Sequence, residues 1–467
     1  MMRPARFLIA LLTCLALGCD EPPIGPCDAL AQTGCDDGLA CETLPDGATA
    51  CFAPVVIEGR AFDLATDTAL AEVRIVALDV NGSPQSSVVR STADGRYRLA
   101  LPTPRAADGA PLPRAALTLR ADAAGYLTFP SGIRPALPID TANPTLIDGR
   151  LVISSPLTEL GLIALAPSPT PRAAIRGHVA RAASGASVLV VAETTGTPGA
   201  SRGASALADR DGDYEIFNLA AGDYAVHAYA QGQSYAPGAA TLAAGETKVV
   251  DLELDAAPTA RVSGNVQLVN PGLGEATSVI LVVESTFDEN VARGDAPPGL
   301  RAPEPGTLPS ITGGFTIEGV PAGRYVVLAA FENDHLVRDA SSIGGTDIVH
   351  QEVLAGVDVT IDESFKLTGA VEILAPGADG PEEVEGTPVF RWVDDSSEDR
   401  YDLVVHDALG QTIWTHSEPS GNRDPMVSYG GPALESGMHY QLTIRSIKDP
   451  DEELSRSENL RGVFFAR

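Results

Sequence analysis

Two stretches of this chain carry the same phrase with the same internal spacing: GDYEIFNLAAGDY at 212–224 and GGFTIEGVPAGRY at 313–325. In each, a short run of alternating apolar residues is joined to a second run through a turn that contains glycine. Such an arrangement is typical of consecutive antiparallel strands. A weaker third copy, DGRY, begins at Asp94. The repeated phrase therefore predicts an all-β chain built from units of roughly 90 to 110 residues.

Proline-rich segments separate these units. Alternating prolines at 166–171 and the short segment 256–259 interrupt the strand pattern, and proline removes donors that a sheet would need. We therefore expect β-sandwiches at 55–166, 172–255 and 260–368. Two long segments interrupt the units themselves, a Pro/Ala loop at 103–114 and a Pro/Gly-rich insertion at 294–309, and we expect both to be adaptable surface loops, the second one mobile.

The last 100 or so residues, 369–467, follow another pattern of strands with period-two alternation, which predicts a fourth sandwich. Phe390 and Trp392 point to the same face, with Arg391 opposed. Trp392 is therefore expected to be a core residue between two sheets, the alternative being an exposed stacking platform.

The N-terminus has the features of an export signal. Arg3 and Arg6 precede an apolar run from Phe7 to Leu17, which is too short to span a bilayer and closes on Gly18-Cys19. We interpret 1–18 as a lipoprotein signal peptide. Residues 15–19 resemble a bacterial lipobox, although the usual leucine is replaced by Ala16, and this resemblance implies lipidation of Cys19. The alternative is a secreted product without lipid.

Four further cysteines lie within 25 residues of one another: Cys27, Cys35, Cys41 and Cys51. In an exported chain, an even number at close spacing predicts two disulfides that hold a small, loop-rich unit, here at 19–54. Three connectivities are possible. The alternative of a zinc site is disfavoured because the spacing lacks the short knuckles of structural zinc sites.

The chain has 32 basic and 62 acidic side chains, a formal charge of −30. Without Arg3 and Arg6 the balance is 30 against 62, or −32. A polyanion such as nucleic acid would be repelled, and no Lys/Arg cluster offers it a footprint. We expect no nucleic-acid partner and interpret the acidic surface as a means of keeping the protein soluble.

Residues 55–365 resemble tandem carboxypeptidase regulatory-like domains, which are prealbumin-like β-sandwiches. The resemblance rests on the opening glycines Gly59, Gly177 and Gly264, on the Asp-Gly-x-Tyr phrase and on the Ala-Gly-x-Tyr phrase. The C-terminal part resembles a fibronectin type III or other immunoglobulin-like module. These resemblances imply tandem prealbumin-like and immunoglobulin-like sandwiches after a small disulfide-rich unit, and they specify a fold and no chemistry.

Catalytic motifs are absent from the sequence. The seven histidines are scattered singly, and there is no H-E-x-x-H zinc motif, no G-x-S-x-G elbow and no G-K-[ST] phosphate loop. We predict no enzyme activity and no cofactor. Asp209, Asp211 and Asp213 surround Gly212 and form a weak calcium candidate, but an ordinary hairpin turn favours the same residues.

Two places could present aromatic rings to a ligand. If Tyr224, Val226 and Ala228 face the core, the alternation places His227 and Tyr229 outward, where an aromatic ring could stack on a sugar. Trp414 is a similar candidate. The alternative in both places is an ordinary structural role.

These features lead to one main hypothesis and two alternatives. The main hypothesis is a non-catalytic lipoprotein of the bacterial cell envelope, at the outer membrane or cell surface in preference to the inner membrane. It would act as a scaffold, adhesion or protein-binding module, with separate sandwiches holding the distal one away from the bilayer. Its expected partners are the membrane, through the lipid, and envelope proteins or glycans. The alternatives are a carbohydrate-binding surface protein and a non-catalytic partner of a secreted peptidase.

Overall fold

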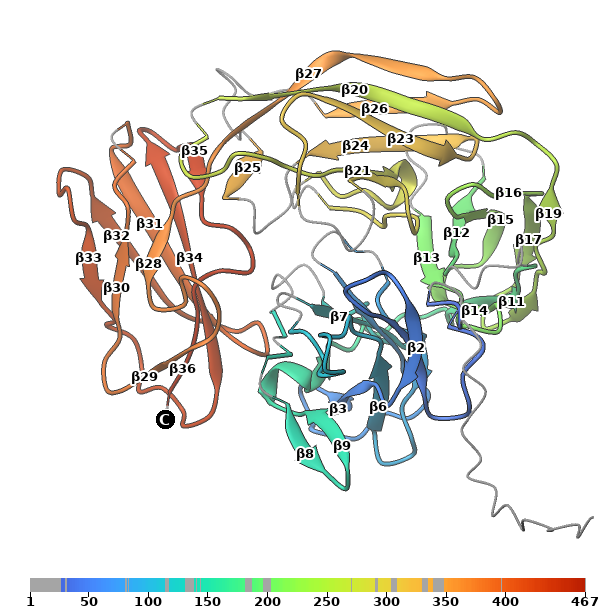
Figure 1. Ribbon diagram of the computed structural model, residues 1–467, viewed down its shortest axis with the longest axis horizontal. Coiled ribbons are helices and arrows are strands. Elements are labelled where there is room, and N and C mark those ends of the chain that lie inside the picture. The colour runs from blue at the N-terminus through green and yellow to red at the C-terminus, as the bar shows by residue number, and fades with distance from the viewer. Residues whose placement is uncertain are drawn as a thin grey trace, which may run out of the picture.

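The computed structural model describes residues 27–466 except 30–31, 80–81, 83, 114–116, 131–137, 140, 143, 181–186, 196–202, 270, 290–292, 304–308, 330–334, 339–347 and 396. In these residues the regular structure consists of β-strands and two short 3-10 turns, without an α-helix (Figure 1). The predicted fold class, tandem β-sandwiches after a small disulfide-bonded unit, is confirmed. That unit is a hairpin of β1 (Ala40–Thr43) and β2 (Thr49–Phe52).

Sandwich 1 consists of two sheets that enclose one core. Its alternation is clearest in β6, where Tyr97, Leu99 and Leu101 are buried and the residues between them are exposed. The first sheet has the order β10 (Leu160–Leu162), β3 (Val55–Asp63), β9 (Arg150–Ile153), β8 (Thr145–Ile147), with β6 (Arg96–Leu101) also on β3. The second has the order β5 (Val89–Arg90), β4 (Arg74–Leu78), β7 (Thr118–Asp122), and the turn η1 (Pro156–Thr158) precedes β10.

Sandwich 2 repeats this layout. One sheet has the order β14 (Asp213–Leu219), β11 (Ala173–His178), β18 (Thr247–Val249), and the other β13 (Gly203–Leu207), β12 (Leu189–Thr194), β15 (Gly222–Tyr229), β17 (Gly238–Leu242). A small ribbon pairs β16 (Ser234–Tyr235) with β19 (Leu254–Asp255). The opening strand β11 pairs antiparallel with the strand of the repeated phrase and parallel with a late strand, as β3 does in sandwich 1.

Sandwich 3 has the same arrangement. Its sheets are β23 (Gly314–Val320), β20 (Ala260–Leu268), β27 (Val359–Gly369), β25 (Leu336–Arg338), and β22 (Arg301–Ala302), β21 (Val279–Val283), β24 (Gly323–Ala329), β26 (Val349–Val353). The turn η2 (Glu284–Thr286) follows β21. The repeated phrase therefore lies at equivalent places, on β14 and β15 in sandwich 2 and on β23 and β24 in sandwich 3.

Sandwich 4 is built differently, as its sequence pattern predicted. A sheet of β28 (Ile373–Ala375), β30 (Val389–Trp392) and β33 (Met426–Ser428) packs on a second sheet with the order β29 (Glu382–Val384), β36 (Val463–Ala466), β34 (His439–Lys448), β31 (Arg400–Asp407), β32 (Thr412–Pro419), with β35 (Glu452–Arg456) on β34. Phe390 and Trp392 are buried between the sheets, so the core role predicted for Trp392 is confirmed.

The opening glycine of each repeat has a specific packing role. Gly177 lies opposite Tyr214, and a Cβ at Gly177 would come within 1.9 Å of the Val250 carbonyl oxygen. The Tyr214 hydroxyl donates a hydrogen bond to the same carbonyl, at 2.6 Å. Because Gly177 has no side chain, the backbone after β18 can approach β11 closely, and the hydrogen bond from Tyr214 holds it there.

The equivalent positions of the other repeats follow the same rule. In sandwich 1, Gly59 faces Tyr97, whose hydroxyl donates to the Thr158 carbonyl at 2.6 Å. In sandwich 3, Gly264 faces Phe315, which has no hydroxyl, and its ring covers the glycine directly. The repeated phrase thus encodes one packing arrangement in all three sandwiches.

Sandwiches 1 to 3 pack against one another. Their strands β4, β12 and β21 are buried along most of their length, which means that both faces of each strand are covered. Val76 of sandwich 1 and Leu189 of sandwich 2 belong to the same cluster of buried side chains as the core of sandwich 3. The expected chain of separate spacers is therefore wrong. The physical reason is that each of these sheets is apolar on its outer face as well as its inner one, and burial of that face is favourable.

Candidate functional site

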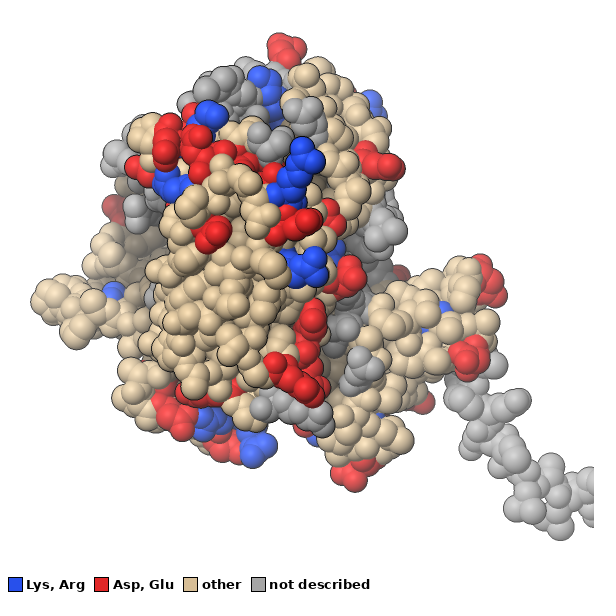
Figure 2. Space-filling model, turned by 90° about the vertical axis from the view of Figure 1, so that its left-hand side faces the viewer, with Lys and Arg blue, Asp and Glu red and all other residues tan. Residues whose placement is uncertain are grey.

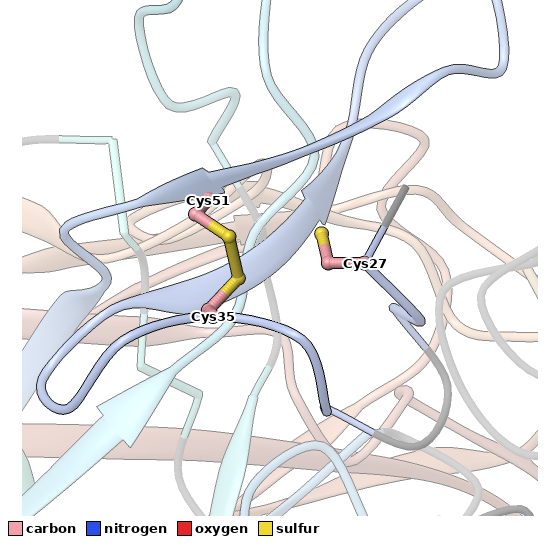
Figure 3. Close-up of side chains that lie close together, drawn as sticks. All are labelled: Cys27, Cys35 and Cys51. Carbon is pink, nitrogen blue, oxygen red and sulfur yellow. A yellow bond between two sulfur atoms is a disulfide. The ribbon is translucent and has the colours of Figure 1, made fainter. Parts of the chain in front are cut away.

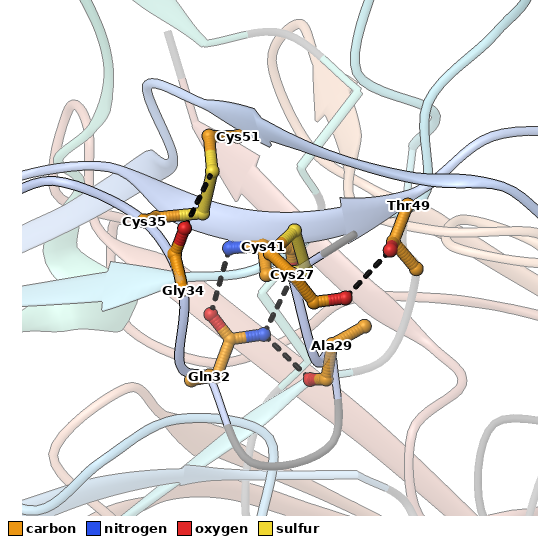
Figure 4. The surroundings of a disulfide bond; sticks show 8 residues. All are labelled: Cys27, Ala29, Gln32, Gly34, Cys35, Cys41, Thr49 and Cys51. Carbon is orange, nitrogen blue, oxygen red and sulfur yellow. Dashed lines mark hydrogen bonds between the residues drawn. A yellow bond between two sulfur atoms is a disulfide. The ribbon is translucent and has the colours of Figure 1, made fainter. Parts of the chain in front are cut away.

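The predicted lipidation residue, Cys19, lies outside the described residues. The four predicted disulfide cysteines are described, and they form the pairs Cys27–Cys41 (Figure 4) and Cys35–Cys51 (Figures 3 and 4). The sulfur atoms of Cys27, Cys35 and Cys51 lie close together, but their positions are occupied by S–S bonds, which excludes the zinc alternative in this state. The Gln32 amide bridges the Ala29 and Cys41 carbonyls and so closes the loop (Figure 4).

The disulfide unit is fastened to sandwich 1 by the loop at 103–114. Glu42 and Arg105 form a buried ion pair, and the Thr103 amide donates to the Glu42 carboxylate at 3.0 Å. The Arg105 guanidinium also donates to the Ala53 carbonyl and lies over the Phe52 ring, 4.7 Å from its centroid. The expectation of an adaptable surface loop is therefore wrong for this part of the loop, because it holds two units together.

The ligand surface predicted at His227 and Tyr229 is not present as expected. His227 is half-buried, whereas Tyr229 is only 4% exposed. Tyr229 does point away from the interior of its own sandwich, but sandwich 3 covers it. Its ring meets Tyr325 edge-on, with centroids 6.0 Å apart, and Gly323 leaves the space that the ring occupies. Burial raises the pKa of the Tyr229 hydroxyl.

Trp414 lies on β32, an edge strand of sandwich 4, and is half-buried. One side of its ring packs on Phe390 and Tyr429, which belong to the core. The His416 ring is stacked on it at 5.3 Å with an interplanar angle of 4°. The structure does not bring Trp414 together with His227 or Tyr229, which lie in another sandwich, so the three residues do not make one site.

The acidic turn at 209–213 is an ordinary hairpin turn in its hydrogen bonds. The Asp209 carboxylate accepts hydrogen bonds from the backbone amides of Asp211 and Asp213, at 3.1 and 2.9 Å. The Asp213 carboxylate contacts the His178 ring. The weak calcium candidate therefore gains no support from this geometry, since the best-placed carboxylate is used by the turn itself.

The strongest concentration of charge inside the molecule lies where sandwiches 1, 2 and 3 meet. Arg120 of β7 is only 9% exposed in its side chain and bonds Asp122 at 2.9 Å and Asp295 of sandwich 3 at 2.6 Å. It also donates to the carbonyl and the hydroxyl of Ser205 in sandwich 2. Burial by itself lowers the pKa of the Arg120 guanidinium, but both carboxylates outweigh it, so the pKa is raised and the group remains cationic.

Two other buried arginines make similar bridges. Arg74 of sandwich 1 donates to the Leu207 and Asp213 carbonyls of sandwich 2, at 2.9 and 3.0 Å. Arg301 of sandwich 3 pairs with Asp79 of sandwich 1 at 3.0 Å. Burial lowers the pKa of both guanidinium groups. These contacts join sandwich 1 to sandwiches 2 and 3.

The insertion at 294–309 was expected to be a mobile surface loop, and this was wrong for residues 294–303. Ala296, Leu300 and Ala302 are buried, and Arg301–Ala302 form the strand β22, which extends the second sheet of sandwich 3. Asp295 supplies the carboxylate for Arg120. The insertion therefore fills the space between sandwiches. Its apolar residues are separated by proline and glycine, so the sequence shows no alternating pattern that would predict a buried strand here.

A cavity of about 230 Å³ lies at this junction. All three sandwiches contribute to its walls, through Leu119 of sandwich 1, Leu189 and Leu207 of sandwich 2, and Val282 and Leu328 of sandwich 3. Arg120 and Asp295 form part of the polar wall. Reasoning from the sequence missed this region. The available signal was the uninterrupted apolar runs at 75–78, 188–192 and 279–283, since strands with both faces buried do not alternate.

The comparisons with known proteins add little to this picture. No family model matches the chain, and no curated protein matches it. Similar solved structures include the Bacillus anthracis TIE protein, at 12% identity over 95% of this chain and 72% of that one, with a TM-score of 0.16. BcpA, the major pilin subunit of Bacillus cereus, is 10% identical over 68% of this chain and 99% of that one, with a TM-score of 0.18. The shaft pilin SpaA of Lactobacillus rhamnosus GG is 11% identical over 43% of this chain and 97% of that one, with a TM-score of 0.17. At these TM-scores the likeness carries no argument about function.

A search of the described part of the chain for a helix long and apolar enough to cross a membrane found none.

Proposed function

We propose that this chain is a non-catalytic lipoprotein of the bacterial cell envelope, anchored through Cys19, that acts as a surface scaffold or adhesion protein and binds other proteins. The observation that carries the proposal is that the buried arginines of sandwiches 1 and 3 bind groups on neighbouring sandwiches. Arg74, Arg120 and Arg301 are all engaged in holding sandwiches together. The charged side chains therefore build a rigid body, which suits a protein that presents a fixed surface.

Sandwich 4 offers such a surface. The outer face of its smaller sheet exposes apolar side chains from three strands, namely Leu374, Val389 and Met426. The view onto this side of the molecule shows a broad area made mostly of uncharged residues, with acidic and basic residues above, below and beside it (Figure 2). Arg391 lies on the same face, opposite Met426. On a chain with a net charge of −30, an exposed apolar face that carries an arginine is typical of a protein interface, where methionine and arginine are enriched.

The resemblance to carboxypeptidase regulatory-like and fibronectin-like domains fits this proposal, because such domains serve as non-catalytic modules. The carbohydrate-binding alternative loses one of its aromatic residues, since Tyr229 is covered by sandwich 3. Tyr229 of β15 therefore cannot serve as a second exposed ring beside Trp414 of β32.

Two measurements in a Gram-negative host test the proposal. With an alkyne-tagged fatty acid, the wild-type chain is expected to be labelled and to sediment with membranes, and Cys19→Ala is expected to lose both properties. A photoreactive residue at Met426, exposed on sandwich 4, should then crosslink a discrete envelope protein. The same residue at Thr247, exposed on sandwich 2, is the matched control.

Retention of label and membrane association by Cys19→Ala would refute the anchor. Equal crosslinking from Met426 and Thr247, or none from either, would refute the assigned binding face.

A further inference from the structure

We infer that the cavity between sandwiches 1, 2 and 3 is a binding site for a compact, uncharged, apolar molecule of about the size of one substituted ring. This inference is independent of the lipid anchor and of the protein-binding face proposed above. It rests on the lining, the volume and the charge balance of the cavity.

The lining is mainly apolar, with a polar wall that includes Arg120 and Asp295, and it comes from three separate sandwiches. Leu119, Leu189, Leu207, Val282 and Leu328 all line the cavity and are all buried. Phe129 adds an aromatic wall. Such a surface offers water few hydrogen-bonding partners, whereas an apolar molecule would regain the dispersion contacts that an unfilled space forfeits.

The volume suits a small molecule. An apolar cavity of about 150 Å³ stays dry and takes up benzene. The present cavity, at about 230 Å³, has room for a ring with one or two substituents. The cavity is partly open to solvent, so a small molecule could enter it from the surface.

The charges at the wall indicate an uncharged ligand. Arg120 and Arg293 both line the cavity, and the Arg120 guanidinium is already engaged by Asp122, Asp295 and Ser205. Arg301 pairs with Asp79, which also lines the cavity. Asp79 and Asp295 would repel a carboxylate or phosphate that enters here, and such an anion would also lose part of its hydration.

The experiment uses the purified chain carrying Cys19→Ala, prepared without detergent so that no acyl chain competes. Toluene is the neutral probe and benzoate the anionic one, and binding is measured by calorimetry and by the shift of the thermal unfolding midpoint. Toluene should bind saturably and raise the midpoint, because it stabilises only the folded state. Benzoate should do neither.

Site specificity is tested with variants of Ala296, a buried residue of the cavity wall. Ala296→Leu and Ala296→Phe fill the space in two steps, so toluene affinity should fall progressively, by at least about tenfold for the larger residue. Ala355→Phe, at an exposed turn of sandwich 3, is the matched control and should bind as the wild type does. In the wild type, the methyl NMR signals of Leu189, Leu207 and Val282 should shift on toluene binding. This measurement does not depend on the folding of any variant.

Three results would overturn the inference. They are no saturable toluene binding to the wild type, unchanged methyl signals at the cavity, and benzoate binding as tight as that of toluene.

Discussion

Arg120 donates to partners from all three of the sandwiches that meet at the cavity. We predict that Arg120→Met lowers the free energy of unfolding by about 3 kcal/mol, because it leaves two partly buried carboxylates without their cation. Urea unfolding at pH 7 measures this. The control is Arg261→Met, which removes an ion pair with Glu318 that is more than half exposed and should cost less than about 1 kcal/mol. Equal losses would show that Arg120 does not join the sandwiches.

Gly177 is the second residue at which one change should matter. A Cβ there would lie 1.9 Å from the Val250 carbonyl, so Gly177→Ala must push β11 and the late strand apart. We expect a loss of about 1 to 3 kcal/mol in unfolding free energy. At Gly380, a Cβ would meet nothing within 4 Å, and Gly380→Ala should leave stability within about 0.5 kcal/mol. A tolerated alanine at 177 would contradict the packing assigned to the repeated phrase.

Tyr229 shows how far single residues can be read from sequence. The alternation along β15 correctly predicts that Tyr229 turns away from the core of sandwich 2, where Val226 lies. It cannot predict what covers the outer face, because that depends on a neighbouring sandwich more than 90 residues away in the chain, at Gly323 and Tyr325. The error therefore concerned exposure, whereas the direction of the side chain was right.

At the scale of elements, the turn η2 is held to β24 and β26 of its own sandwich through a titrating group, Glu284. The hydrogen bond from Arg324, followed by that from His350, lowers the pKa of the Glu284 carboxyl below its ordinary value of 4.5. A lowered pKa stabilises the folded state above pH 4.5, and this contribution is lost as the pH falls through the folded-state value.

We therefore predict that Glu284→Gln costs about 0.5 to 1 kcal/mol in unfolding free energy at pH 7. The difference from wild type should shrink toward zero as the pH is lowered from 4.5 to 3, measured by urea unfolding at each pH. A difference that stays constant over this range would show that the carboxylate charge of Glu284 is not what Arg324 and His350 stabilise.

Elements were the scale at which sequence was most informative. The repeated phrase located β14, β15, β23 and β24, and the opening glycines located β3, β11 and β20, because each of these positions is fixed by contacts within one sandwich. The insertion that contains β22 was recognised, but its burial between sandwiches was not foreseen. Its role depends on Arg120 and Asp79, which come from a different sandwich.

At the scale of the whole molecule, the sandwiches form one body. Sandwich 4 joins it through Ala408 and Val463, which cluster with the core of sandwich 1, and through Glu458, which accepts from the His335 amide of sandwich 3 at 2.9 Å. Small-angle X-ray scattering of the purified chain should give a radius of gyration near the value of about 22 Å for a single compact body of this length. A much larger radius, with separate peaks in the distance distribution, would mean that the sandwiches move independently.

The place of Cys27 limits how far this body can lie from a membrane. If Cys19 carries the lipid, seven residues lie between it and Cys27, and the fully extended chain between the two cysteines reaches at most about 29 Å. The tether cannot lengthen by unravelling, because Cys27 is bonded to Cys41 and the hairpin behind it is held to sandwich 1 by Glu42 and Arg105. The protein would therefore lie low over the lipid headgroups, and its partners would have to come to the bilayer surface to meet it.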